Sequence, residues 1–127
     1  MIQESLKILF ADDDPTTRLL MQSAMQKMGF EVTIACNGEE AVAFFRKAVF
    51  DMVLLDVEMP EMDGFEVCEL LREEAGNELP IIMTTGMDDE QSINDAFEAG
   101  ATDFISKPIN FVIKIGTGFV RNHIKPI

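Results

Sequence analysis

Several short apolar runs in this sequence end in residues whose side chains could do chemistry. Asp12 and Asp13 follow the first of these runs, and Asp56 follows another. Thr85 and Lys107 stand in the same way at the ends of two later runs. The set therefore combines three carboxylates, one hydroxyl group and one ammonium group.

Three carboxylates that meet in space require a cation or a proton between them. Two carboxylates about 4 Å apart repel each other by about 4 kcal/mol at an effective dielectric constant near 20. Hard oxygen ligands around an incomplete shell suit Mg²⁺, which keeps several waters and shares the oxygens of phosphate groups. A free carboxylate as nucleophile, a hydroxyl donor and a lysine are the groups that phosphoryl transfer needs, because its catalysis rests on positioning and charge neutralisation.

Each of these residues, taken alone, has an ordinary structural explanation. The acidic triplet at 12–14 is by itself more often a solvated loop that leads into a helix cap. Asp56 could be a turn or cap residue, and Thr85 is ordinary strand chemistry. A lysine before a proline is a common place for a strand to stop. Their joint occurrence at separate strand ends is what favours a shared site.

The apolar runs predict strands that alternate with helices. The runs are short, bulky and without alternating polarity, which is typical of strands covered on both faces. Strand–helix alternation predicts βαβ units over a parallel sheet, whose ligands bind beyond the carboxyl ends of the strands. The expected strands are 8–11, 32–35, 52–55, 81–83 and 104–105.

Capping residues and apolar stripes predict the helices. Asp14 before Pro15 is a typical N-cap and first helical residue, and Asn37 and Asp63 each stand three residues before a glutamate. Asp89 should cap a fourth helix. The expected inward-facing residues are Leu20, Ala24 and Met28 on the first helix, Val67, Leu70 and Leu71 on the third, and Ile93, Ala96 and Phe97 on the fourth.

The closing segment 111–125 should form a fifth helix of atypical sequence. Phe111, Ile115 and Phe119 are four residues apart and would share one helix face. Two glycines in the same stretch cost about 2 kcal/mol together relative to alanine. We therefore expect a weakly protected helix, with an irregular segment or one exchanged between two molecules as the alternative.

Composition limits the class of protein. A chain of 127 residues fits a single domain over 1–127, and 47% hydrophobic residues supply a core. The net charge of −13 disfavours direct binding to nucleic acid or to anionic lipid. No apolar run is long enough to span a membrane, and no secretory signal precedes the first run. Cys36 and Cys68 are expected to be buried thiols, so we expect a cytoplasmic protein.

Four stretches, taken together and in this order, resemble the response regulator receiver family of two-component signalling. The stretches are ILFADDDPTTR at 8–18, MVLLDVEMPEMDGFEV at 52–67, PIIMTTG at 80–86 and AGATDFISKPI at 99–109. The resemblance implies a flavodoxin-like α/β fold, a (βα)5 three-layer sandwich with a parallel sheet in the order 2-1-3-4-5. It also implies that a histidine kinase or phosphotransfer protein donates a phosphoryl group in a Mg²⁺-dependent reaction that switches the conformation.

The resemblance implies a role for each acidic residue of the set. Asp56 is implied as the phosphoacceptor and as a metal ligand. Asp13 is implied as a direct ligand of Mg²⁺, and Asp12 as its partner, largely through water. The backbone carbonyl of Glu58 is implied as a further ligand.

The same resemblance implies contacts for the phosphoryl group and a conformational switch. Thr85 and Lys107 would contact the phosphoryl group, and the peptide bond between Lys107 and Pro108 is cis in this family. Phe104 stands where the family has a rotating aromatic residue, so Thr85 and Phe104 would form the switch.

Three other classes of protein fit these residues less well. A phosphatase of the haloacid dehalogenase type needs a second aspartate where Glu58 stands. A flavodoxin-like electron carrier needs a hydroxyl-rich first loop, and an unphosphorylated docking module would not need the intact set. We expect a signalling switch, with at most self-phosphotransfer and autodephosphorylation. Its output would come from a downstream domain or from a second copy bound through the fourth helix, fifth strand and fifth helix.

Overall fold

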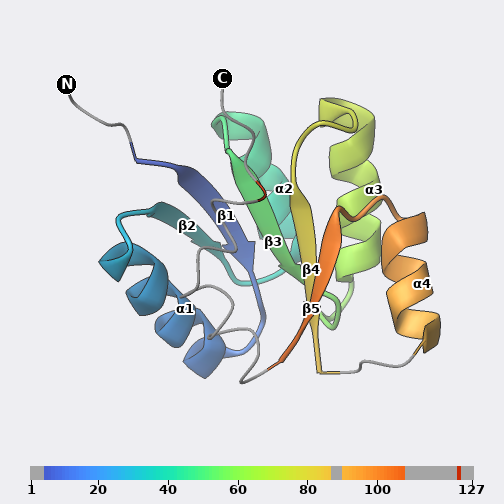
Figure 1. Ribbon diagram of the computed structural model, residues 1–127, viewed down its shortest axis with the longest axis horizontal. Coiled ribbons are helices and arrows are strands. Elements are labelled where there is room, and N and C mark those ends of the chain that lie inside the picture. The colour runs from blue at the N-terminus through green and yellow to red at the C-terminus, as the bar shows by residue number, and fades with distance from the viewer. Residues whose placement is uncertain (1–4, 87–89, 108–122, 124–127) are drawn as a thin grey trace.

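The computed structural model describes residues 5–86, 90–107 and 123, which form a parallel sheet with helices on both faces (Figure 1). The strand order is β2-β1-β3-β4-β5, as predicted. The strands are β1 (Lys7–Ala11), β2 (Glu31–Ala35), β3 (Met52–Asp56), β4 (Ile81–Thr85) and β5 (Asp103–Ser106). The helices are α1 (Pro15–Lys27), α2 (Gly38–Lys47), α3 (Gly64–Ala75) and α4 (Glu90–Glu98).

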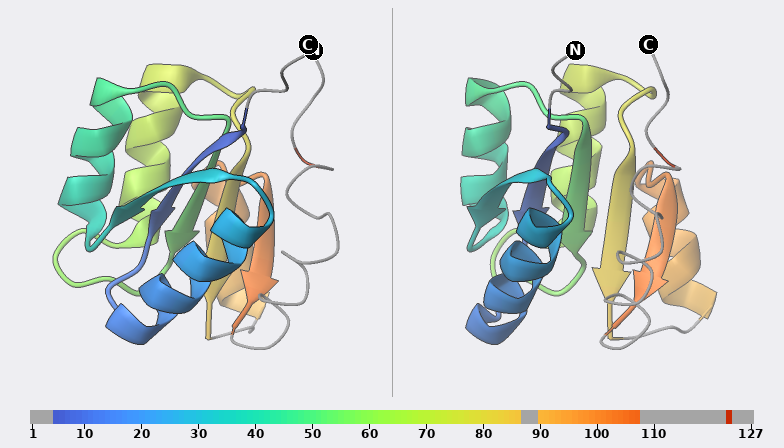
Figure 2. Two further views of the ribbon diagram at one scale, coloured as in Figure 1. Left: turned by 90° about the vertical axis from the view of Figure 1, so that its left-hand side faces the viewer. Right: turned by 60° about the vertical axis from the view of Figure 1, so that its left-hand side comes forward.

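Two apolar cores lie on the two faces of the sheet. Leu9 and Leu55 point to the core shared with α2, α3 and α4, whereas Phe10 and Leu54 point to the core shared with α1. Figure 2 shows α1 on one side of the sheet and α2 and α3 on the other. Because neighbouring strand residues point to opposite faces, burial of both faces explains the uninterrupted apolar runs. The predicted three-layer arrangement is confirmed.

The predicted helix starts that fall within the described residues are confirmed. The Asp14 carboxylate accepts hydrogen bonds from the backbone N of Thr17 at 2.9 Å and from its hydroxyl at 2.6 Å. The side chains of Asn37 and Asp63 cap α2 and α3 by accepting from backbone N atoms three residues later, at 2.8 and 2.9 Å. Asp89, Pro108 and, apart from His123, the segment 111–125 lie outside the described residues.

The predicted inward-facing residues of two helices are correct only in part. On α1 the buried residues are Met21 and Met25, while Leu20 is 57% exposed. On α4 Ala96 is buried but Phe97 is 48% exposed. On α1 the buried Met21 lies one position after Leu20, and on α4 the predicted Ala96 is buried whereas its larger neighbour Phe97 is not, so hydrophobicity was a poor guide to the helix face.

The predicted burial of the cysteines is correct for one of them. Cys68 lies on the buried face of α3, and burial raises the pKa of its thiol to about 11. Cys36 is exposed, because it lies in the loop after β2, where its backbone N donates to the Glu40 carboxylate at 2.8 Å. Among the residues described here, no helix is sufficiently long and apolar to cross a membrane.

The Arg72 side chain fastens the end of α3 to the starts of β4 and β5. Its guanidinium donates to the carbonyl oxygens of Leu79 at 2.6 Å, Gly100 at 2.7 Å and Gly76 at 3.0 Å. It also donates to the Thr102 hydroxyl at 3.1 Å. Burial lowers the pKa of Arg72, so these acceptors must offset the cost of desolvating its charge.

We expect Arg72→Met to lower the free energy of unfolding by about 2 to 4 kcal/mol, because it leaves several carbonyl oxygens without their charged donor. Urea unfolding followed by circular dichroism measures the change. Arg46→Met is the control, because Arg46 pairs with Glu74 at 2.8 Å on the exposed surface of α2. If the two substitutions shift the unfolding midpoint equally, the hydrogen bonds of Arg72 do not contribute to stability as proposed.

Candidate functional site

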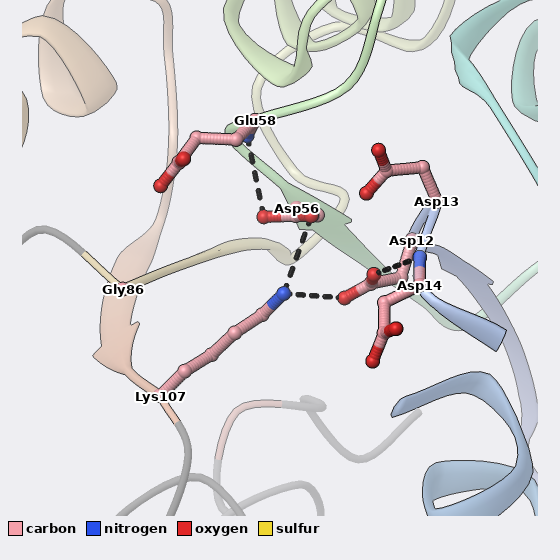
Figure 3. A pocket seen from close by; sticks show the side chains of 7 residues that line it. All are labelled: Asp12, Asp13, Asp14, Asp56, Glu58, Gly86 and Lys107. Atoms are coloured by element: carbon pink, nitrogen blue, oxygen red, sulfur yellow. Dashed lines mark hydrogen bonds and ion pairs between the residues drawn. The ribbon is translucent and has the colours of Figure 1, made fainter. Parts of the chain in front are cut away.

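The polar residues at the strand ends meet at one edge of the sheet. Asp12 directly follows β1, Asp56 is the last residue of β3, and Lys107 directly follows β5. The register pairs Asp56 with Thr84 and Thr85 with Ser106, so the carboxyl ends of the strands are level. A pocket of about 290 Å³ opens there (Figure 3). It is lined by Asp12, Asp13, Asp14, Asp56, Glu58, Gly86 and Lys107.

Three carboxylates of this pocket lie close enough to share one cation. Asp12, Asp13 and Asp56 each offer an oxygen, and these oxygens lie within 4.8 Å of one another. Asp12 is fully buried and Asp56 is 3% exposed, whereas Asp13 faces solvent. The donors are all hard oxygens, and the exposed side leaves room for water and phosphate oxygens, which is the arrangement that Mg²⁺ prefers. The residues therefore fit a magnesium ion.

Lys107 lies between two of the carboxylates. Its Nζ is 2.5 Å from Oδ2 of Asp12 and 3.2 Å from Oδ2 of Asp56 (Figure 3). Burial alone would lower the pKa of Lys107, but its hydrogen bond to Asp12 and the charges of both carboxylates outweigh burial and raise the pKa. Lys107 is therefore a fixed positive charge at the floor of the pocket.

The Asp56 carboxyl group resists ionisation in the absence of a metal ion. Burial, and next the negative charge of Asp12, raise its pKa from 3.8 to about 7, although Lys107 opposes the shift. At neutral pH the site therefore holds a proton part of the time. A divalent cation would favour the carboxylate, so metal binding and proton release at Asp56 are expected to be coupled.

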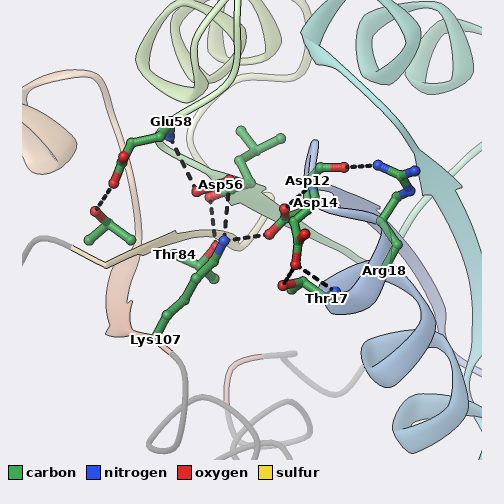
Figure 4. Close-up of polar contacts among 10 residues, drawn as sticks. Asp12, Asp14, Thr17, Arg18, Asp56, Glu58, Thr84 and Lys107 are labelled. Atoms are coloured by element: carbon green, nitrogen blue, oxygen red, sulfur yellow. Dashed lines mark hydrogen bonds and ion pairs between the residues drawn. The ribbon is translucent and has the colours of Figure 1, made fainter.

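Backbone contacts fix both buried carboxylates. Oδ1 of Asp12 accepts from the backbone N of Asp14 at 2.8 Å, and Oδ1 of Asp56 accepts from the backbone N of Glu58 at 3.2 Å (Figure 4). The start of α3 packs against Asp56, and a Cβ atom at Gly64 would lie 2.3 Å from the Asp56 carbonyl oxygen. A glycine is required there, because any other residue would push the strand that ends in Asp56 away from the helix.

The structure places the two predicted switch residues outside the pocket lining. The Thr85 side chain is fully buried, and its hydroxyl donates to Oε1 of Glu58 at 3.5 Å. Phe104 is half-buried on β5, opposite Met83 of β4. The contact between Thr85 and the Glu58 side chain was not predicted, since the sequence analysis used only the Glu58 backbone carbonyl.

The sequence matches a known family over most of its length. The profile described as the response regulator receiver domain matches residues 8–112. The probable transcriptional regulator ycf27 of Porphyra purpurea is 39% identical over 110 residues, which are 87% of this chain and 44% of that protein. The transcriptional regulatory protein ResD of Bacillus subtilis is 39% identical over 104 residues, which are 82% of this chain and 42% of that protein. The chain spans about half the length of these curated relatives.

Solved structures share the fold and most of the chain. The chemotaxis response regulator CheY4 of Vibrio cholerae has a TM-score of 0.85 and 32% identity, covering 93% of this chain and 98% of that chain. The BeF3-activated DrrB receiver domain has a TM-score of 0.81 and 30% identity, covering 94% of this chain and 97% of that chain. The sheet order and helix placement of this chain are thus those of proteins described as response regulators.

Proposed function

The chain belongs to the response regulator receiver family of two-component signal transduction, and on this premise we propose that Asp56 accepts the phosphoryl group. The observation that carries the proposal is the position of Asp56. Its carboxylate lies at the end of the central strand β3, 3.2 Å from the Lys107 ammonium, and lines a pocket open to solvent. Asp12 makes the same two kinds of contact, to Lys107 and to a backbone N–H, but it is fully buried and follows β1, whereas Asp56 is the last residue of β3 and keeps 3% exposure.

The transfer step needs an ionised, positioned nucleophile. One Asp56 oxygen attacks the phosphorus atom of a phosphohistidine, the P–N bond breaks, and its electron pair stays on the imidazole, which takes up a proton. The donor would be a histidine kinase or a phosphotransfer protein. Lys107 stays within reach of Asp56 Oδ2 and offsets the negative charge that arrives with the phosphoryl group.

Asp12, Asp13, Asp56 and the backbone carbonyl of Glu58 would hold Mg²⁺. When bound, the ion would neutralise these carboxylates and the oxygens of the phosphoryl group. Asp13 supplies the solvent-facing ligand, whereas buried Asp12 stays hydrogen-bonded to Lys107 and to the backbone N of Asp14. This proposal is supported by the spacing of the three carboxylates.

Phosphorylation of Asp56 would move Thr85 and Phe104, which lie outside the pocket lining. The Thr85 hydroxyl would exchange its long contact with Glu58 for an oxygen of the phosphoryl group. Because Thr85 ends β4, that movement would shift the residues that follow it toward Asp56 and give Phe104 on the neighbouring strand β5 space to turn. The altered surface would be the face of α4 and β5.

The chain acts in this proposal as a switch within a larger pathway. Curated relatives described as transcriptional regulators are about twice as long, which supports an output domain elsewhere in such proteins. A second copy bound through the α4 and β5 face is the other output. The only catalysis would be the transfer onto Asp56 and the later loss of that phosphoryl group. Residues 1–127 would form a single domain. The protein would act in the cytoplasm, without direct contact to nucleic acid or membrane.

Phosphorylation by a small donor tests this function directly. In the presence of acetyl phosphate and Mg²⁺, intact-mass spectrometry should show the gain of one phosphoryl group, which hydroxylamine then removes. Without Mg²⁺, or in an Asp13→Asn variant, labelling should be much slower, since the charges of the pocket remain unneutralised. A wild-type chain that stays unlabelled under these conditions would disprove the proposed transfer.

A further inference from the structure

We propose that Arg18 is a positioning residue for the magnesium site. Its guanidinium Nη1 donates a hydrogen bond to the backbone carbonyl oxygen of Asp12 at 2.9 Å. Figure 4 shows the guanidinium reaching this oxygen from α1, on the side of Asp12 that faces away from Lys107. The inference rests on the proposed function, because it concerns how the same site binds its metal ion.

Every polar group of buried Asp12 is engaged, and Arg18 supplies the partner of one of them. The Asp12 backbone N donates to the Ala35 carbonyl on β2 at 3.2 Å, and its two carboxylate oxygens accept from the backbone N of Asp14 and from Lys107. The carbonyl oxygen is the remaining group, and Arg18 donates to it. Without Arg18, the carbonyl oxygen of Asp12, a residue with 0% exposure, would lose this donor. Because a buried carbonyl oxygen without a donor is unfavourable, the peptide between Asp12 and Asp13 would rotate toward another donor.

The orientation of that carbonyl group decides where the next carboxylate points. The peptide unit is planar, so a fixed Asp12 carbonyl fixes the direction in which the chain enters Asp13. The Asp13 side chain is exposed and receives little support from packing, so its direction depends on this backbone. Arg18 therefore holds the Asp13 carboxylate toward Asp56, although it contacts neither residue's carboxylate in the described structure.

Positioning and simple electrostatics predict opposite results when Arg18 is removed. Arg18 is a cation close to a site for another cation, so Coulomb repulsion alone would make its removal tighten Mg²⁺ binding. A role in orienting the ligands predicts weaker binding, because partners that orient metal ligands typically change metal affinity by 10- to 100-fold. The sign of the change therefore separates the two effects.

Calorimetric titration with Mg²⁺ alone tests the inference on Arg18→Met, which keeps the length of the stem and removes the donor. We expect the Mg²⁺ dissociation constant to rise about tenfold or more. Arg18→Lys should restore part of the affinity, because its ammonium still offers a donor. Arg46→Met, which removes the same charge on α2, should bind as the wild type does.

Thermal melts without Mg²⁺ separate metal binding from a purely structural role. Arg18→Met that melts lower but binds Mg²⁺ with unchanged or higher affinity would overturn the positioning role. If Arg18→Met does not fold, Arg18→Gln, whose amide is too short to reach the carbonyl, is measured with the same expectation and the same overturning result. A wild-type chain that does not bind Mg²⁺ would overturn the proposed metal site itself, so the two failures are distinguishable.

Discussion

An Asp56→Asn protein should take up no phosphoryl group from acetyl phosphate and Mg²⁺ under conditions that label the wild-type chain fully. The amide has nearly the volume of the carboxylate but is not a nucleophile, and loss of a nucleophile lowers rates by about 10³-fold or more. Asp13 also lines the pocket and faces solvent, but the ion pairs of Lys107 go to Asp12 and Asp56. Intact-mass spectrometry measures the stoichiometry.

Asp95→Asn is the matched control for this experiment. Asp95 lies on α4, outside the pocket, and accepts a hydrogen bond from Gln91 at 2.8 Å that an asparagine oxygen can also accept. This variant should label as the wild type does. If Asp56→Asn still gains one phosphoryl group per chain, the assignment of the phosphoacceptor is wrong.

The sheet and the location of the site were predictable because few physical rules determine them. Apolar runs without alternation indicate strands buried on both faces, and parallel strands bring all their carboxyl ends to one edge. Asp12, Asp56 and Lys107 could therefore be placed together before any coordinates were known, and the structure brings them within hydrogen-bonding distance. Their roles in phosphoryl transfer rest on the proposal above.

Helix rotation was predicted less well, because it depends on how whole surfaces fit. Leu20 and Phe97 are strongly apolar residues of their helices, yet the buried residues beside them are Met21 and Ala96. Flexible methionines fill irregular gaps, and a small alanine allows a helix to approach a sheet closely. Ranking the residues of a helix by hydrophobicity alone therefore does not predict which face contacts the sheet.

The hydrogen bonds of the two arginines were the features least predictable from the sequence. Arg72 and Arg18 both bind backbone carbonyl oxygens, which every residue carries, so no partner residue type signals the interaction. Arg18 does stand four residues after the N-cap Asp14, one helical turn into α1, and so faces back toward the loop that holds Asp12. That spacing is a signal that could have pointed to Arg18.

The stability of the metal-free protein should fall as the pH rises from about 4 to about 7, and Asp56 should account for much of the fall. The pKa of its carboxyl group is about 7 in the folded chain, against 3.8 for an unperturbed aspartate. Between these values the folded state holds a proton that the unfolded state has lost, so the free energy of unfolding decreases with rising pH. Above about pH 8 both states are ionised and the contribution is constant.

Comparison with Asp56→Asn isolates this effect, because the amide cannot ionise. A pKa raised from 3.8 to about 7 corresponds to at most about 4 kcal/mol. Since Asp56 shares its site with Asp12 and Lys107, we expect Asp56→Asn to be more stable than the wild type by roughly 2 to 4 kcal/mol at pH 8, and by little at pH 4. Urea unfolding at several pH values, with EDTA present, measures the difference, and Asp95→Asn serves again as the control.

Saturating Mg²⁺ should reverse the order of the two proteins at pH 8. The ion binds the carboxylate form, so it stabilises the wild type by mass action and removes the cost of ionising Asp56 in the fold. Asp56→Asn lacks one ligand and should gain much less. Two results would each show that ionisation of the Asp56 carboxyl group does not lower the stability of the metal-free protein. One is that Mg²⁺ stabilises both proteins equally, and the other is that the wild-type stability without metal does not change between pH 5 and pH 8.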